Sequence, residues 1–139
     1  MTAPATVPSR WVLAATAAGV VVVGLGARQL PGAVGDLAGG VLYAVLATLL
    51  VAIVAPRARP TTLGAVAFAV CAAVELAQLT GVPAAAVDAV PAARYVLGTT
   101  FHAPDLAAYA VGTAVTAVGL AAVRASGARK AHAAPDPGR

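Results

Sequence analysis

The sequence predicts an all-α integral membrane protein, a four-helix bundle with short outer loop segments. Of its 139 residues, 60% are hydrophobic and only 10% are charged, whereas a soluble domain carries about 25% charged residues. The charged residues leave four uncharged apolar runs, each close to the roughly 20 residues that a helix needs to cross a hydrocarbon core. The basic residues also gather on one side of these runs, as expected for a multi-pass membrane protein.

The uncharged runs cover residues 11–27, 37–56, 60–74 and 106–123. From them we expect helices at about 11–27, 37–55, 62–80 and 105–123, within a membrane domain of residues 10–124. The third run reaches spanning length only if Glu75 and Gln78 are included. Residues 1–9 and 125–139 show no apolar pattern, and we expect disordered tails there.

The first helix begins with Arg10 and Trp11, a pair that suits an anchor at the membrane interface. The alternative is a cleaved signal peptide, because the run has a basic start and small residues near its end. We favour a retained helix, since the run is long for a signal peptide. Pro31 and Gly32 then predict a turn before the second helix.

Asp36 stands at the predicted start of the second helix, where a negative charge interacts favourably with the helix dipole and stabilises the helix. Gly35 and Gly39 form a small-xxx-small pair that permits close helix approach. A basic turn at 56–60 follows, after which Thr61 or Thr62 is expected to cap the third helix.

Gly81 and Pro83 predict the end of the third helix. Residues 84–94 are too polar and too short to span a membrane, so they form either a short interfacial helix or a loop. Residues 97–104 then lead to the fourth helix, and Asp105 stands at its start.

Counting basic residues orients the chain. Two of the nine, Arg28 and Arg94, fall on one side of the predicted spans, and seven fall on the other: Arg10, Arg57, Arg59, Arg124, Arg129, Lys130 and Arg139. The positive-inside rule therefore predicts cytoplasmic termini. Heavy use of Ala, Val, Gly and Arg suggests a bacterial genome, hence a bacterial plasma membrane. The lipid bilayer is the expected partner, and no nucleic acid is expected, because the basic residues stand at the ends of apolar runs.

This topology collects the other ionisable residues near the outer surface. Glu75 and Gln78 lie three residues apart on one helical face, and Arg28 and Arg94 are the natural partners of the costly Glu75 charge. The candidate ligand-binding cluster is Arg28, Asp36, Glu75, Gln78, Arg94, Asp105 and Tyr109. The alternative is a set of polar contacts that only lock the helices together. We expect His102 to be an exposed loop residue and Cys71 to be a packing residue.

Three segments carry a family resemblance: VELAQL, YVLGTTFHAPDLAAYAVG and GDLAGGVLYAVL. They resemble a family of small bacterial membrane proteins catalogued as a domain of unknown function, which is similar to VanZ-like proteins. Glu75 and Gln78 match the Glu-x-x-Gln element of the VanZ-like pattern, and Asp105 and Gly112 match its last element, where Tyr109 replaces the usual Asn. The resemblance implies a shared fold and a role facing the cell envelope.

These observations favour a protein whose outer polar cluster engages a cell-envelope component, such as a lipid-linked precursor. The alternative is a structural or assembly subunit of a membrane complex, with a small-residue face at Ala108, Gly112 and Thr116. A proton carrier using Glu75 ranks lower, since the cytoplasmic half offers no ionisable group to complete a path. We find no motif for a cofactor, a metal or a catalytic nucleophile, so we do not expect an enzyme, although Glu75 with Asp105 would suit acid–base chemistry.

Overall fold

A computed structural model describes residues 7–133 of the chain, and every regular element in this range is helical. The elements are α1 (Arg10–Ala27), α2 (Gly32–Val54), α3 (Pro60–Ala77), η1 (Gln78–Thr80), α4 (Val82–Ala89), η2 (Pro91–Ala93), α5 (Arg94–Leu97) and α6 (Ala103–Ala133). Four helical segments are long and apolar enough to cross a membrane: α1, α2, α3 with η1, and α6. The predicted all-α membrane class is therefore confirmed.

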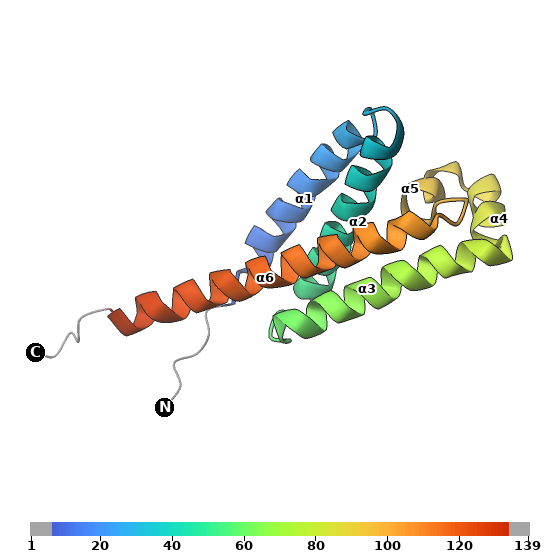
Figure 1. Cartoon of the computed structure of the whole chain (residues 1–139). Helices are drawn as coiled ribbons and strands as arrows, with labels where there is room; N and C mark the ends of the chain where they lie inside the picture. Colours follow the sequence, from blue (N-terminus) through green and yellow to red (C-terminus); the bar gives the residue numbers. More distant parts are fainter. Residues whose placement is uncertain (1–6, 134–139) are drawn as a thin grey trace, which may run out of the picture.

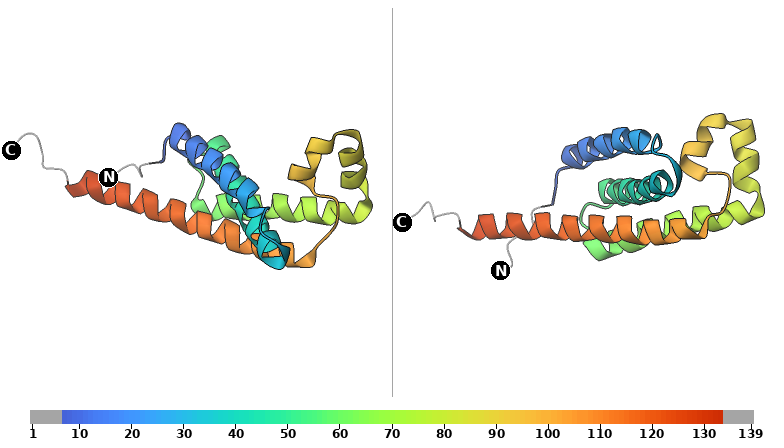
Figure 2. Two further views of the ribbon diagram at one scale, coloured as in Figure 1. Left: turned by 90° about the horizontal axis from the view of Figure 1, so that it is seen from above. Right: turned by 45° about the horizontal axis from the view of Figure 1, so that its top comes forward.

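The long helices form two antiparallel pairs that cross one another (Figure 1). α2 packs against all three other long helices, α6 packs against α2 and α3, and α1 lies at the edge of the bundle, mainly against α2 (Figures 1 and 2). Large apolar side chains on the outside remain exposed, including Trp11, Val22 and Val54. Such surfaces suit contact with lipid rather than water.

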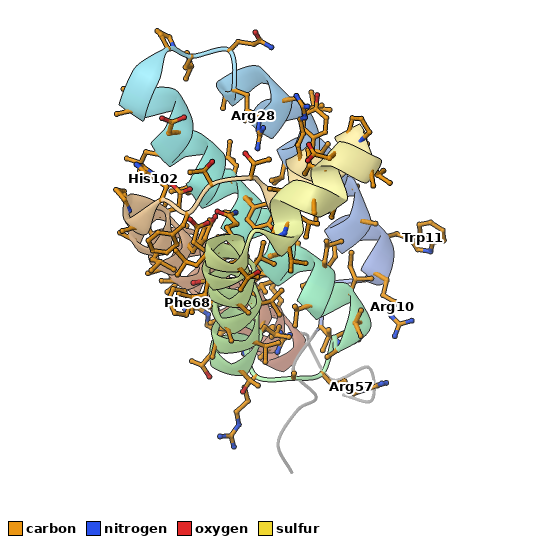
Figure 3. All side chains as sticks on the ribbon, turned by 90° about the vertical axis from the view of Figure 1, so that its right-hand side faces the viewer. Arg10, Trp11, Arg28, Arg57, Phe68 and His102 are labelled. Atoms are coloured by element: carbon orange, nitrogen blue, oxygen red, sulfur yellow. The ribbon has the colours of Figure 1, made fainter. Side chains whose placement is uncertain are left out.

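The bundle has two different ends. The site end holds the α1–α2 connection and the segment from α4 to the start of α6, and the opposite end holds the α2–α3 connection. In Figure 3, Arg28 and His102 lie toward the site end, whereas Arg10 and Arg57 lie toward the opposite end. Residues 84–94, which were left open between a short helix and a loop, are mainly helical: α4, η2 and the first residue of α5 lie there.

The apolar core falls into two clusters. The larger cluster belongs to the opposite end and joins all four long helices through Leu13, Ala17, Leu49, Ala52, Leu63 and Leu120. The smaller one lies toward the site end and consists of Ala44, Cys71 and Tyr109, with Tyr43 and Phe68 packed against it. Cys71 is 1% exposed, in keeping with its expected packing role.

Small residues set the closest helix crossing, between α2 and α6. A Cβ atom on Gly40 would lie 2.9 Å from the Cβ of Ala108, and one on Gly112 would lie 2.8 Å from the Cβ of Ala44. The expected pair of Gly35 and Gly39 does not serve this purpose. A Cβ on Gly39 would meet nothing within 4 Å, and the atoms nearest to one on Gly35 would be backbone atoms of Leu30 and Ala27.

Two helix starts differ from expectation. α2 begins at Gly32 after an extended Pro31, so Asp36 lies in the second turn rather than the first. α3 begins at Pro60 with Arg59 at the N-cap and no side-chain cap bond. Proline suits the first helical position because its backbone φ is already helical and its missing N–H has no partner to lose. Thr61 and Thr62 are therefore inside the helix and do not cap it.

The two predicted tails also differ from expectation where the structure describes them. At the N-terminal end, the Ser9 hydroxyl accepts a hydrogen bond of 3.3 Å from the backbone N–H of Val12 and caps α1. At the C-terminal end, α6 continues to Ala133, ten residues past the expected end at residue 123. Residues 124–133 are rich in Ala, Arg and Lys, which have high helix propensity. The remainder of both predicted tails, residues 1–6 and 134–139, lies outside the described part.

Candidate functional site

A cavity of about 520 Å³ opens at the site end, between the α1–α2 connection, α2, the end of α3, α5 and the start of α6. All seven residues of the predicted cluster line it: Arg28, Asp36, Glu75, Gln78, Arg94, Asp105 and Tyr109. The structure therefore brings these seven residues together around one cavity. Whether these side chains bind a ligand stays a prediction.

Glu75 is the most buried charged side chain at this site, with 1% of its surface exposed. Its Oε1 atom accepts a hydrogen bond of 2.5 Å from the backbone N–H of His102, and its Oε2 atom accepts one of 3.0 Å from the Tyr109 hydroxyl. Buried carboxylates need such donors, because removal from water otherwise costs several kcal/mol.

The expected pairing of Glu75 with Arg28 or Arg94 is wrong. Among residues 7–130, no carboxylate lies within 4.0 Å of either guanidinium group. The reason is the path of the chain. The loop before α6 runs past the end of α3, so the His102 N–H, rather than an arginine, lies next to the Glu75 carboxylate. The arginines belong to other elements, the end of α1 and the start of α5.

His102 joins the site through its ring as well as its backbone. The ring Nδ1 lies 3.1 Å from Asp105 Oδ1, and this hydrogen bond raises the pKa of His102 above its usual value. We expected an exposed loop residue, and the ring is indeed exposed, but the contacts with Asp105 and Glu75 were missed. The available signal was the spacing, since residues three apart at a helix start can meet.

The backbone of α5 is held by two side chains from the bundle. The Gln78 Nε2 donates a hydrogen bond of 2.7 Å to the Leu97 carbonyl, and the Tyr43 hydroxyl donates one of 2.8 Å to the Val96 carbonyl. Gly98 follows with φ +62°, and a Cβ there would lie 2.6 Å from Gln78 Nε2. Glycine is required at this position, because other residues rarely adopt this backbone conformation.

One polar atom of this arrangement lacks a partner. The Oε1 of Gln78 is buried and accepts no hydrogen bond within the described part of the chain. Buried polar atoms are normally satisfied, so this oxygen is an exception among the polar groups of the residues that line the cavity.

Aromatic rings surround the charged groups. The Arg28 guanidinium carbon lies 5.5 Å from the centroid of the Tyr95 ring, within the range of a cation–π contact. The Tyr43 and Tyr109 rings lie 5.8 Å apart with a 49° tilt. The role of Tyr95 was not predicted, because α5 (Arg94–Leu97) is too short to give a periodic signal in the sequence. No group of three or more His, Cys, Asp or Glu that could hold a metal occurs among the described residues.

Comparison with known proteins gives one finding. No curated protein and no solved structure matches this sequence significantly. A family model described as "Protein of unknown function (DUF2809)" matches residues 29–113, more than half of the chain. The matched segment begins in the α1–α2 connection and ends in α6, so it carries every cavity residue of the predicted cluster except Arg28. The chain therefore belongs to this family of proteins of unknown function, DUF2809.

Proposed function

We propose that this chain is a multi-pass membrane protein whose cavity binds the polar group of a cell-envelope component, such as a lipid-linked precursor. The observation that carries the proposal is the buried Glu75 carboxylate in the wall of a 520 Å³ cavity. An ionisable side chain within a spanning segment is costly, and such residues commonly mark binding sites or proton paths. A leucine at this position would enter the bilayer more easily.

The proposed orientation places the cavity at the outer face of a bacterial plasma membrane. Six basic residues of the described chain belong to the opposite end: Arg10, Arg57, Arg59, Arg124, Arg129 and Lys130. Of the basic residues that the structure describes, only Arg28 and Arg94 belong to the site end. The positive-inside rule then puts the opposite end and both termini in the cytoplasm. A cavity facing outward would meet envelope precursors rather than cytoplasmic metabolites.

The resemblance to VanZ-like proteins supports the same role. Glu75, Gln78, Asp105 and Gly112 match that pattern, and the first three line the cavity. Tyr109 stands where the pattern usually has Asn, and its hydroxyl donates a hydrogen bond to Glu75. The substitution therefore keeps a hydrogen-bond donor at this place.

A second function, helix locking in an assembly subunit, is favoured by one observation. The two hydrogen bonds to Glu75 join α3 to α6 and to the loop before it, as a purely structural contact would. The small-residue face expected to meet a partner offers little support. Its members Ala108 and Gly112 are buried within the chain against α2.

Thiol labelling in intact cells separates these two functions. In a Cys71→Ala background, single cysteines replace Ala33, Thr99, Thr61 and Gln78, and a membrane-impermeant reagent is applied. Ala33 serves better than Gly32, whose φ of +64° disfavours a side chain. We expect labelling at positions 33 and 99 but not at 61. Labelling at 78 supports a water-filled outer cavity, whereas protection at 78 with labelling at 99 supports a sealed packing contact.

Function itself is tested with Glu75→Gln and Asp105→Asn. Both variants keep the side-chain shape and remove a negative charge. We expect them to change the sensitivity of cells to antibiotics that act on the envelope, at unchanged amounts of protein in the membrane. Asp88→Asn, on the exposed surface of α4, is the matched control. Unchanged sensitivity in both cavity variants would count against the proposed function.

A further inference from the structure

Resting on the proposed function, we propose that the cavity takes a zwitterionic phosphate–amine group. The phosphate lies on the side of Arg28 and Arg94, and the ammonium lies on the side of the carboxylates. The lipid headgroup phosphoethanolamine and its soluble counterpart share this chemistry.

The first observation is that the arginines and the carboxylates lining the cavity come from different elements and do not pair. The two arginines come from the end of α1 and from α5, whereas Asp36, Glu75 and Asp105 come from α2, α3 and α6. Within residues 7–130, no ion pair joins the two sets. Opposite charges that share a cavity without neutralising one another favour a ligand that carries both signs.

The arginine side suits a phosphate. Guanidinium groups bind phosphate oxygens through two parallel hydrogen bonds. Arg28 is placed against the Tyr95 ring, which restrains its position without using its N–H groups. Both Arg28 and Arg94 are exposed, so a ligand can reach them without a change in the fold.

The carboxylates of the cavity suit an ammonium group. Asp36 and Asp105 both line the cavity and offer oxygen acceptors. An ammonium group has three N–H donors to offer, and a phosphate has none. The rings of Tyr43 and Tyr109 line the same cavity and suit a cation through their π faces.

The volume is also adequate. Small-molecule sites usually measure about 300–1,000 Å³, and this cavity measures about 520 Å³. A headgroup with a phosphate and a short amine arm fits within that space, whereas its acyl chains would extend along the exposed apolar surface of the helices.

The test measures binding to the full chain in detergent with three probes. They are dihexanoylphosphatidylethanolamine, dihexanoylphosphatidylglycerol (the same phosphate without the amine) and soluble phosphoethanolamine. We expect the ethanolamine lipid to bind at least about tenfold more tightly than the glycerol lipid, which is the effect of one charge-assisted hydrogen bond. Soluble phosphoethanolamine binding as tightly as the ethanolamine lipid identifies a free ligand, and much weaker binding identifies a lipid.

Variants assign each end of the ligand. Arg28→Gln should weaken the binding of both lipids by about tenfold, whereas Asp36→Asn should weaken only the ethanolamine lipid. Both residues are exposed, so neither change should unfold the chain. Arg57→Gln at the opposite end and Asp88→Asn on α4 remove the same charges away from the cavity and should leave binding unchanged.

Three results would overturn the inference. Equal binding of the two lipids, both weakened by Arg28→Gln, would leave a headgroup site in place but refute the zwitterion. Absence of binding by all three probes, or equal weakening by Arg57→Gln and Arg28→Gln, would refute the assigned ligand altogether. The proposed function is then decided separately by labelling at position 78.

Discussion

The two ends of the bundle differ in how the long helices pack against one another. At the opposite end, leucines and alanines from all four long helices fill the space between them. At the site end, the helices meet through glycine and alanine near Ala108 and Gly112, and beyond this crossing a cavity of about 520 Å³ remains. Between the long helices, one end is filled with apolar side chains, whereas the other keeps a cavity lined by charged and polar residues.

Polar contacts repeat the contrast. At the opposite end, Arg124 donates hydrogen bonds of 2.7 and 2.9 Å to the carbonyls of Ala58 and Pro56 and so fastens the α2–α3 connection to α6. At the site end, the hydrogen bonds of Glu75 and Gln78 hold the rim of a cavity instead. Side-chain hydrogen bonds to the backbone therefore fasten a connection at one end and border a cavity at the other.

The largest effect should come from the filled end. Leu63 is 1% exposed within the larger core cluster, and Leu63→Ala should lower the free energy of unfolding by about 3 kcal/mol through the cavity it leaves. Thermal unfolding in detergent measures the change. Leu76→Ala, on the exposed face of the same helix, is the control and should have little effect. Equal losses would mean that the end we describe as filled is not tightly packed.

A somewhat smaller effect is expected at the site end. Glu75→Leu leaves the His102 N–H and the Tyr109 hydroxyl without their acceptor, at a cost of about 2 kcal/mol. Glu75→Gln keeps oxygen at one position and should cost about half as much. Adding Tyr109→Phe to Glu75→Leu should recover part of the loss, since no hydroxyl is then left unpaired. A more stable Glu75→Leu single variant would contradict this account.

Arg124→Gln should have a smaller effect again. It removes two hydrogen bonds to the carbonyls of the α2–α3 connection, and because the side chain is partly buried we expect a loss of about 1 kcal/mol. The same loss should appear as faster protease cleavage within residues 56–60. Arg129→Gln, at an exposed position on the same helix, should change neither measurement. If Arg124→Gln is cleaved no faster than the wild type, the two hydrogen bonds of Arg124 do not stabilise the α2–α3 connection.

The smallest effect should be a dependence on pH at the site end. The hydrogen bond to Asp105 raises the pKa of His102, so protonated His102 is favoured in the folded chain. The resulting stability is fully present below the unfolded pKa of about 6.5 and is lost as pH rises through the folded pKa. The melting temperature of the wild type should therefore exceed that of Asp105→Asn by more at pH 5.5 than at pH 8.5. A constant difference would argue against this pair.

Much of the fold was predictable because the bilayer imposes it. Uncharged runs near spanning length identified four membrane helices, and the structure has all four. The gathering of the polar cluster followed too, because alternate helix ends lie on the same side of a membrane. Helix ends were predicted less well, since Pro31 and Pro60 start α2 and α3 earlier than the charge pattern suggests.

The contacts within the site were not predictable. Charge alone favoured an arginine as the partner of Glu75, whereas the structure uses a backbone N–H and a hydroxyl. Backbone donors carry no sequence signal, because every residue except proline has one. The same holds for the α5 carbonyls that Gln78 and Tyr43 hold.

The sequence by itself determined the class of this protein, the number of its spans and the end at which its polar residues meet. These follow from hydrophobicity and charge along the chain, because each segment's own apolar length and charge decide whether it spans a bilayer. Only the tertiary structure decided that the polar residues surround a cavity and that Gly112 rather than Gly35 meets a neighbouring helix. It also decided that the cavity arginines form no ion pair with a carboxylate of the described residues. Those features depend on how the helices cross and how the loop before α6 runs, and they arise between segments far apart in the chain.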